Sequence, residues 1–149
     1  MFLHDKETPV IEERIMMAVV RVSELFKRKS TAIFARHGLS FSQYNVLRLL
    51  EASRDSQCAI TEISRRLLIS TPNLSGIAKR LEKGGFIRRD RDAADERKTI
   101  LVLESPGRLV LTEIGNLQEM NFKTFLDHCP ENRKQDLLDL LKGMLKLEG

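Results

Sequence analysis

Apolar residues recur at intervals of three and four along most of the chain, a spacing that predicts a mainly helical protein. The first helix is predicted over residues 10–37, where the apolar stripe is wider than one core-facing side. Its members are Ile11, Ile15, Met16, Val19, Val20, Val22, Phe26, Ile33 and Phe34. A helix that is apolar on more than one side needs a second surface to cover it, and Gly38 is suited to end it.

Two shorter helices are predicted next. Ser40 and Gln43 have the spacing of a capping box, so a helix is expected over residues 41–53. The polar run "SRDSQ" that follows the helix predicts a loop. Residues 60–69 then show one apolar face at helical spacing and predict a short third helix.

The segment after the third helix contains residues that start another one. Ser70 or Thr71 can cap its N-terminus, and Pro72 suits the first helical position because its missing N–H is not needed there. Gly84 and Gly85 are expected to end this helix. A short helix, a tight turn and a second short helix together predict a helix-turn-helix.

Two strands and two further helices complete the predicted order of elements. The segments "FIRRD" and "KTILVL" flank the charged "RDAADER", which predicts two short strands in a β-hairpin with a charged tip. A helix is predicted from Pro106 to about His128, and another over residues 131–147 after Pro130. The fold class is therefore mainly α with a small β-hairpin wing, a winged helix-turn-helix flanked by N- and C-terminal helices.

Composition and charge add a candidate partner. A chain of 149 residues with 42% hydrophobic residues fits one domain with a real core. The segment from Arg65 to Lys98 holds ten Lys and Arg residues and five acidic ones, whereas the whole chain has a net charge of only +4. The positive field therefore belongs to the predicted helix-turn-helix and hairpin, and a polyanion is its natural partner.

In a winged helix-turn-helix the second helix fits the major groove of double-stranded DNA. Small or polar residues on its first turns can approach bases, and the basic residues beyond them can contact phosphates. An arginine at the hairpin tip can enter a narrow minor groove. The predicted DNA-binding residues are Ser70, Thr71, Pro72, Asn73, Ser75, Gly76, Lys79, Arg80, Arg91, Arg97 and Lys98.

Asp95 is unusual in a loop that faces phosphates, because its carboxylate would be repelled. We expect it to orient an arginine of the wing through a hydrogen-bonded ion pair. The alternative is that Asp95 is a plain turn residue.

The segment "ITEISRRLLISTPNLSGIAKRLEKGGFIRR" resembles the helix-turn-helix of the MarR family of bacterial transcription regulators. The helix exit of that family is matched by Leu81, Glu82, Gly85, Phe86 and Ile87, and its wing signature by Asp95, Arg97 and Leu103. Two positions differ, since Glu104 replaces the usual Thr and Pro106 precedes Gly107.

The resemblance implies a single MarR-like domain over residues 1–149, with a DNA-binding lobe over residues 41–104. It also implies a homodimer joined through helices in residues 10–37 and 106–147, which would cover the wide apolar stripe. The expected function is that of a sequence-specific transcriptional repressor on a pseudo-palindromic operator. A small aromatic or amphipathic effector would bind between the dimer helices and the lobe and weaken DNA binding.

Other functions find little support in the sequence. No catalytic constellation or phosphate loop is present, so no enzyme activity and no cofactor are expected. Three histidines and two cysteines (Cys58 and Cys129) lack the spacing of metal ligands or of a disulfide framework, so packing is favoured over a sensor thiol. No apolar run is long enough to span a membrane and the first residues are polar, so a cytoplasmic protein is expected.

The two alternatives to DNA binding are a protein–protein adaptor and an RNA-binding protein. A winged helix can act as a protein–protein adaptor, but an adaptor should lack both the polar, base-approaching residues and the basic wing. RNA binding would require exposed aromatic residues for stacking, whereas the one tyrosine and seven phenylalanines mostly lie in predicted core stripes.

Overall fold

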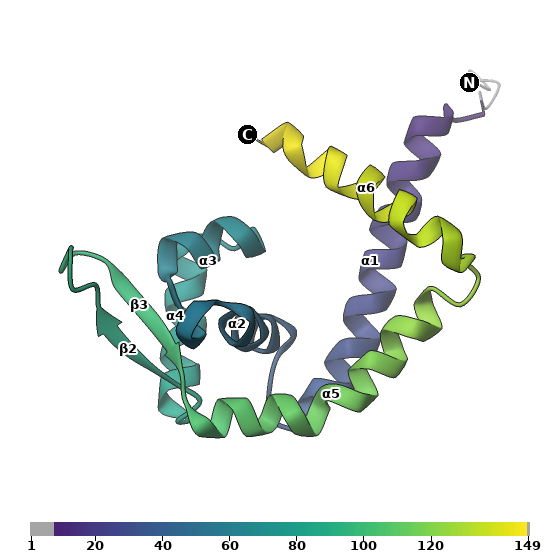
Figure 1. Ribbon diagram of the computed structural model, residues 1–149. Coiled ribbons are helices and arrows are strands. Elements are labelled where there is room, and N and C mark those ends of the chain that lie inside the picture. The colour runs from purple at the N-terminus through teal and green to yellow at the C-terminus, as the bar shows by residue number, and fades with distance from the viewer. Residues whose placement is uncertain (1–7, 149) are drawn as a thin grey trace, which may run out of the picture.

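The computed structural model describes residues 8–148 and confirms a mainly helical fold with a small sheet. Figure 1 shows two parts: a compact group of short helices beside the strands, and a pair of long helices that extends away from it. The helices are α1 (Ile11–Ala35), α2 (Phe41–Ala52), α3 (Ile60–Leu67), α4 (Thr71–Lys83), α5 (Ser105–Phe125) and α6 (Lys134–Leu145). The strands are β1 (Gln57–Ala59), β2 (Ile87–Arg91) and β3 (Thr99–Leu103). None of the helices in this part of the chain combines the length and apolarity that crossing a bilayer requires.

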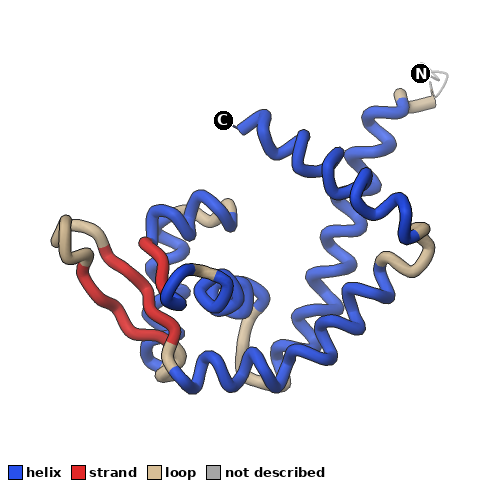
Figure 2. The backbone as a smooth tube through the Cα atoms, viewed as in Figure 1, coloured by secondary structure: helices blue, strands red, loops and turns tan. Residues whose placement is uncertain are grey.

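The sheet has one strand more than the sequence predicted. The expected hairpin is formed by β2 and β3, and β1 pairs antiparallel with the other edge of β3, in the order β1-β3-β2. Gln57 was expected in a polar loop but lies in β1 opposite Val102. A strand of three residues is too short to show an alternating pattern, and it is stabilised by pairing with β3 rather than by its own sequence. Figure 2 shows all strands on the side of the molecule away from α6.

We call α2, α3, α4 and the three strands the winged lobe. Its core is continuous and dry: side chains from each helix and from β3 are less than 2% exposed. The largest of these lobe side chains are Leu47, Leu50, Ile63, Leu74, Leu81 and Leu101. The C-terminal end of α1 joins this core through Phe34, whose ring stacks on Tyr44 with centroids 3.9 Å apart.

Serine caps fix the starts of two lobe helices. The predicted capping box is confirmed: the Ser40 hydroxyl accepts a hydrogen bond from the Gln43 backbone N–H, and the Gln43 side chain accepts one from the Ser40 N–H. At α4 the cap is Ser70 rather than Thr71, with Pro72 in the first turn. Each cap satisfies backbone donors that helix geometry leaves free.

The start of α5 packs very closely on the lobe. A Cβ atom added to Gly107 would lie 2.5 Å from the carbonyl oxygen of Phe86, so only glycine fits there. The backbone N–H of Glu104 donates to the same carbonyl at 3.0 Å. The helix begins at Ser105, one residue before the predicted Pro106, and ends at Phe125, three residues before the predicted His128.

We call α1, α6 and the part of α5 from residue 115 onward the arm. Within it Phe26 packs against Phe122 and Phe125 with ring centroids 5.7 and 5.5 Å apart. Ser30 and Gln118 are buried, and Gln118 donates to the Ser30 hydroxyl at 3.1 Å. Many of the other apolar side chains of the arm are exposed. They include Ile11, Ile15, Met16, Met17, Val20, Val22, Leu25, Leu117, Met120, Leu138, Leu140, Met144 and Leu145.

Candidate nucleic-acid interface

The first turns of α4 present polar groups to solvent. The Ser70 hydroxyl accepts the Asn73 backbone N–H at 3.4 Å, which holds the start of the helix. Thr71, Pro72 and Asn73 are exposed, while Ser75 and Gly76 are half-buried. The opposite face is buried because Leu74, Ile77, Ala78 and Leu81 enter the core of the lobe. The exposed side of α4 is therefore polar and small, as contact with base edges requires.

Two aspartates shape the tip of the wing. Asp92 accepts the Ala94 backbone N–H at 2.8 Å, and Asp95 accepts the Arg97 backbone N–H at 3.1 Å. The expected ion pair between Asp95 and an arginine side chain does not occur among the described residues. Asp95 is instead a turn residue, as the alternative predicted. An aspartate side chain readily accepts a hydrogen bond from the backbone two residues ahead. Asp95 therefore orients the backbone at Arg97 and does not hold the Arg97 guanidinium.

Seven of the eleven predicted residues line two hollows on the two flanks of α4, and Pro72, Gly76, Lys79 and Arg91 line neither. Thr71 and Ser75 line a hollow of about 230 Å³ together with Arg97 and Lys98, so the helix and the wing tip meet there. Asn73 and Arg80 line a second hollow of about 390 Å³ on the other flank. The start of α2 forms the far wall of that second hollow. The sequence did not separate these two groups.

Most of the predicted cations are available to a ligand. Lys79, Arg80, Arg91, Arg97 and Lys98 are exposed, and none of them forms an ion pair within the described part of the chain. Unpaired charges of this kind can neutralise phosphates without first giving up a protein partner.

Arg88, on the neighbouring strand β2, is different. Its guanidinium lies 3.2 Å from both Asp90 and Glu104, and the hydrogen bond that it donates to Glu104 is the main reason that the pKa of Arg88 is raised. Its charge is already balanced, so Arg88 is less suited to bind a phosphate than the unpaired cations.

Several residues that line these hollows are not among the DNA-binding residues predicted from the sequence. Ser40 and Ser42, at the start of α2, face the hollow that contains Asn73, and Thr61 of α3 lies in the hollow next to the wing. They come from other elements, more than ten residues away along the chain. No local pattern marks them, and Ser40 was explained fully by its capping role.

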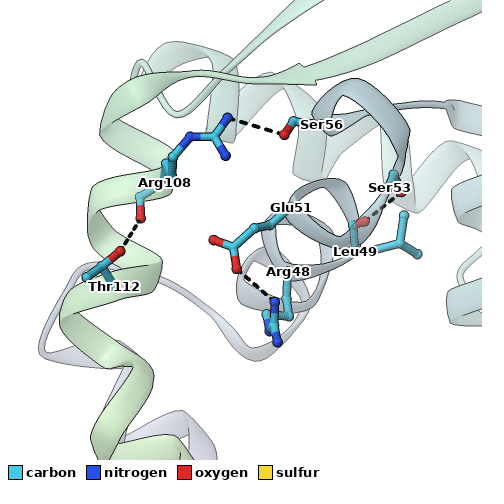
Figure 3. Close-up of polar contacts among 7 residues, drawn as sticks. All are labelled: Arg48, Leu49, Glu51, Ser53, Ser56, Arg108 and Thr112. Carbon is cyan, nitrogen blue, oxygen red and sulfur yellow. Dashed lines mark hydrogen bonds and ion pairs between the residues drawn. The ribbon is translucent and has the colours of Figure 1, made fainter.

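A groove separates α2 from α5, at the boundary between the winged lobe and the arm. It encloses about 420 Å³ and is lined by Tyr44, Arg48 and Glu51 of α2 and by Gln118 and Phe122 of α5, among others. Figure 3 shows the edge of this region, where Glu51 points toward α5 and pairs with Arg48 at 2.8 Å. Burial raises the pKa of the Tyr44 hydroxyl, so it stays a neutral hydrogen-bonding group. The groove thus offers aromatic surface beside charged groups.

The other reactive side chains form no site in this part of the structure. No group of three potential metal ligands occurs among the described residues, and His4 lies outside them. Cys58 is half-buried in β1, and burial is the main reason that the pKa of its thiol is raised. A raised pKa lowers the thiolate fraction and makes Cys58 a poor sensor.

Comparison with known proteins agrees with this geometry. A family model described as MarR family matches residues 37–98, the whole helix-turn-helix and the hairpin up to its tip. This part of the chain is therefore similar to the MarR family. The transcriptional regulator PapX of Escherichia coli is 28% identical over 130 residues, which cover 84% of this chain and 79% of PapX. Such relatives are regulators and not enzymes, as the sequence predicted.

Solved structures share the fold of this chain. Sco3205, a MarR-family regulator from Streptomyces coelicolor in complex with DNA, matches with a TM-score of 0.83 and 20% identity, over 95% of this chain and 91% of Sco3205. BpsR of Bordetella bronchiseptica matches with a TM-score of 0.79 and 18% identity, over 93% and 97% of the two chains. The BpsR structure concerns the regulation of its DNA binding by 6-hydroxynicotinic acid.

Proposed function

We propose that this chain is a sequence-specific DNA-binding repressor that acts as a homodimer. The observation that carries the proposal is the hollow shared by α4 and the wing tip, where Thr71 and Ser75 face Arg97 and Lys98. Polar groups for base edges and unpaired cations for phosphates thus lie on one surface. The DNA complex of Sco3205, which has the same fold, supports this reading.

The two flanks of α4 have different tasks in this proposal. The helix enters the major groove, where the exposed Asn73 contacts a base, with adenine its favoured partner. Arg97 extends from the wing into the adjacent minor groove, held by the negative potential there more than by base identity. Lys79 and Arg80 contact the phosphates between the two grooves.

The apolar arm supports the homodimer. Leu25, Leu140 and Leu145 are among a large set of exposed apolar side chains on the arm, and a chain of this size rarely leaves such a surface uncovered. A second copy of the chain covers it in our proposal. A two-fold dimer then binds a pseudo-palindrome whose half-sites lie about one helical turn apart, roughly 10 base pairs.

The groove between α2 and α5 is the proposed effector site. Tyr44 and Phe122 offer aromatic surface, and Arg48 can bind a carboxylate once it gives up its ion pair with Glu51. The regulation of BpsR by 6-hydroxynicotinic acid, a small aromatic acid, supports a ligand of this size and chemistry. Because α5 packs on the lobe at Gly107 and continues into the arm, a ligand bound against it would change the position of the lobe and weaken DNA binding.

Selection of duplexes from a random pool, followed by binding measurements, tests the proposal. We expect a two-fold motif, and an affinity that falls with salt because each neutralised phosphate releases counterions. Arg97→Ala should weaken binding to operator and random duplex alike. Asn73→Ala should instead weaken operator binding by roughly 1–3 kcal/mol and relax discrimination at one or two base pairs.

Lys123→Ala is the matched control, because it removes an exposed cation from the arm. It should leave both affinities unchanged. If no duplex is retained even at low salt, the adaptor alternative gains. A motif without two-fold symmetry would contradict the proposed dimer.

A further inference from the structure

Arg89, on β2, turns toward the recognition helix α4. Its side chain is only 27% exposed, whereas the side chain of its neighbour Arg88 is 51% exposed. One terminal nitrogen of Arg89 donates to the backbone carbonyl of Ser75 at 3.5 Å. Its Nε lies 3.6 Å from the carboxylate of Glu82.

The two contacts lie on one side of α4. Ser75 and Glu82 are seven residues apart, which is close to two helical turns, so both point to the face that packs on β2. The guanidinium therefore bridges two turns of α4 from the adjacent strand. A planar group with donors in a fixed fork is suited to such a bridge, and a lysine ammonium is not.

The contacts of Arg89 are also long. Its Nε is buried and has no hydrogen-bond acceptor within the described residues. A buried donor without an acceptor is costly, so the side chain must stay near Glu82 to recover part of this energy through the charge. Both of the polar contacts that the described residues form between α4 and β2 come from Arg89.

We propose that Arg89 is a positioning residue that fixes the angle between α4 and the wing, so that Asn73 and Arg97 reach one duplex together. The inference rests on the proposed function. Ser75 belongs to the first turns of α4, where base contacts are made, and β2 leads directly into the tip that carries Arg97. Without Arg89 the wing moves relative to α4, and its arginine contributes less to binding.

A double-mutant experiment on the full chain and the selected operator tests this. In the wild-type background Arg97→Ala should weaken binding about tenfold. In an Arg89→Met background, which keeps the side-chain stem but removes the bridge, the same change should weaken binding less than about threefold. The matched control is an Arg88→Met background, where the full loss should persist because Arg88 faces away from α4.

The outcomes separate three explanations. If Arg89 contacts a phosphate directly, or only stabilises the fold, Arg97→Ala keeps its full effect in the Arg89→Met background, and the inference is overturned while the proposed function stands. If the wild-type chain binds no duplex, or Arg97→Ala binds as tightly as wild type, both fall. Glu82→Gln removes the carboxylate that faces Arg89. In that background, too, Arg97→Ala should weaken binding less than it does in the wild type, so the test stays decisive if Arg89→Met folds poorly.

Discussion

The winged lobe and the arm contain similar residues but bury them differently. In the lobe Leu47, Leu50 and Leu101 are fully buried, whereas in the arm Leu140 is 68% exposed and Leu145 is 61% exposed. The lobe therefore closes a core with its own helices and sheet. The arm exposes a surface whose apolar side chains gain stability only when another surface covers them.

The helix starts also differ. In the lobe Ser40 caps α2 and Ser70 caps α4. The lobe helix α3 and the helices α1, α5 and α6 have no side-chain cap at their starts. Local sequence thus defines the beginnings of the two capped lobe helices, while the arm helices depend on packing. Four substitutions can break or sharpen this comparison, beginning with the largest effect.

Gly107→Ala should cause the greatest loss, because it acts where the lobe joins α5. The new Cβ atom would lie 2.5 Å from the Phe86 carbonyl oxygen, a backbone atom that cannot move away easily. Overpacking of this kind should lower the free energy of unfolding by about 3 kcal/mol, measured by urea denaturation.

Gly115→Ala is the control on the same helix, because its new Cβ atom would meet nothing within 4 Å. It should raise stability by about 0.5–1 kcal/mol, since alanine favours the helix. A mild effect of Gly107→Ala would mean that α5 can slide along the lobe.

Leu25→Glu should act on the arm alone. Leu25 is exposed and lines apolar hollows along α1 and between α1 and α5, where the partner copy is proposed to sit. A charge there should weaken dimerisation by about 2 kcal/mol or more. Sedimentation should show more of the 17.1 kDa monomer. The circular dichroism spectrum of the chain should be unchanged.

Leu109→Glu is the matched control, because Leu109 is 61% exposed but lies near the start of α5, outside the arm. It should leave the dimer intact. Equal effects of the two substitutions would contradict the division into lobe and arm.

Ser40→Ala should cost about 1 kcal/mol of stability, because it removes one hydrogen bond of the capping box at α2. Thermal unfolding measures the loss. Ser105→Ala, at the uncapped start of α5, should have no measurable effect. A similar loss at both sites would show that the serines act through something other than capping.

Leu68→Gly should produce the smallest change, and a favourable one. Leu68 ends α3 in the left-handed conformation with φ of 54°, which is strained for leucine, and its side chain is 59% exposed. Glycine adopts this conformation freely, so stability should rise by about 0.5–1 kcal/mol. Leu68→Ala keeps the backbone strain, and an equal gain from it would assign the cost to the exposed side chain instead.

The lobe was largely predictable from sequence because its signals are local. A capping serine, a proline in the first helical turn and the pair Gly84-Gly85 predicted α4 within about a residue. The strand β1 was not predictable, because it depends on pairing with β3 and not on its own three residues. The role of Asp95 was misjudged for a related reason: its partner is the backbone of Arg97, and sequence indicates which charges are near but not which atoms they contact.

The residues of the candidate site were identified as a set but not as an arrangement. Asn73 and Arg97 lie on opposite flanks of α4, which follows only from the packing of the wing. Arg89 was counted with the other basic residues of its strand. Its inward direction depends on the register of β2 against β3, and the run of five charged residues after Ile87 carries no information about that register.

The helix α5 runs for 21 residues without interruption from the lobe into the arm. At about 1.5 Å per residue it is a rod of roughly 30 Å. Its first turn cannot move relative to the lobe at Gly107, so the rod and the lobe turn as one body. A tilt of about 10° at the distal end would therefore displace the lobe by roughly 5 Å, more than the 3.4 Å rise of one base pair in DNA. In the proposed dimer, small adjustments where two copies meet would then be enough to put the lobes out of register with their half-sites.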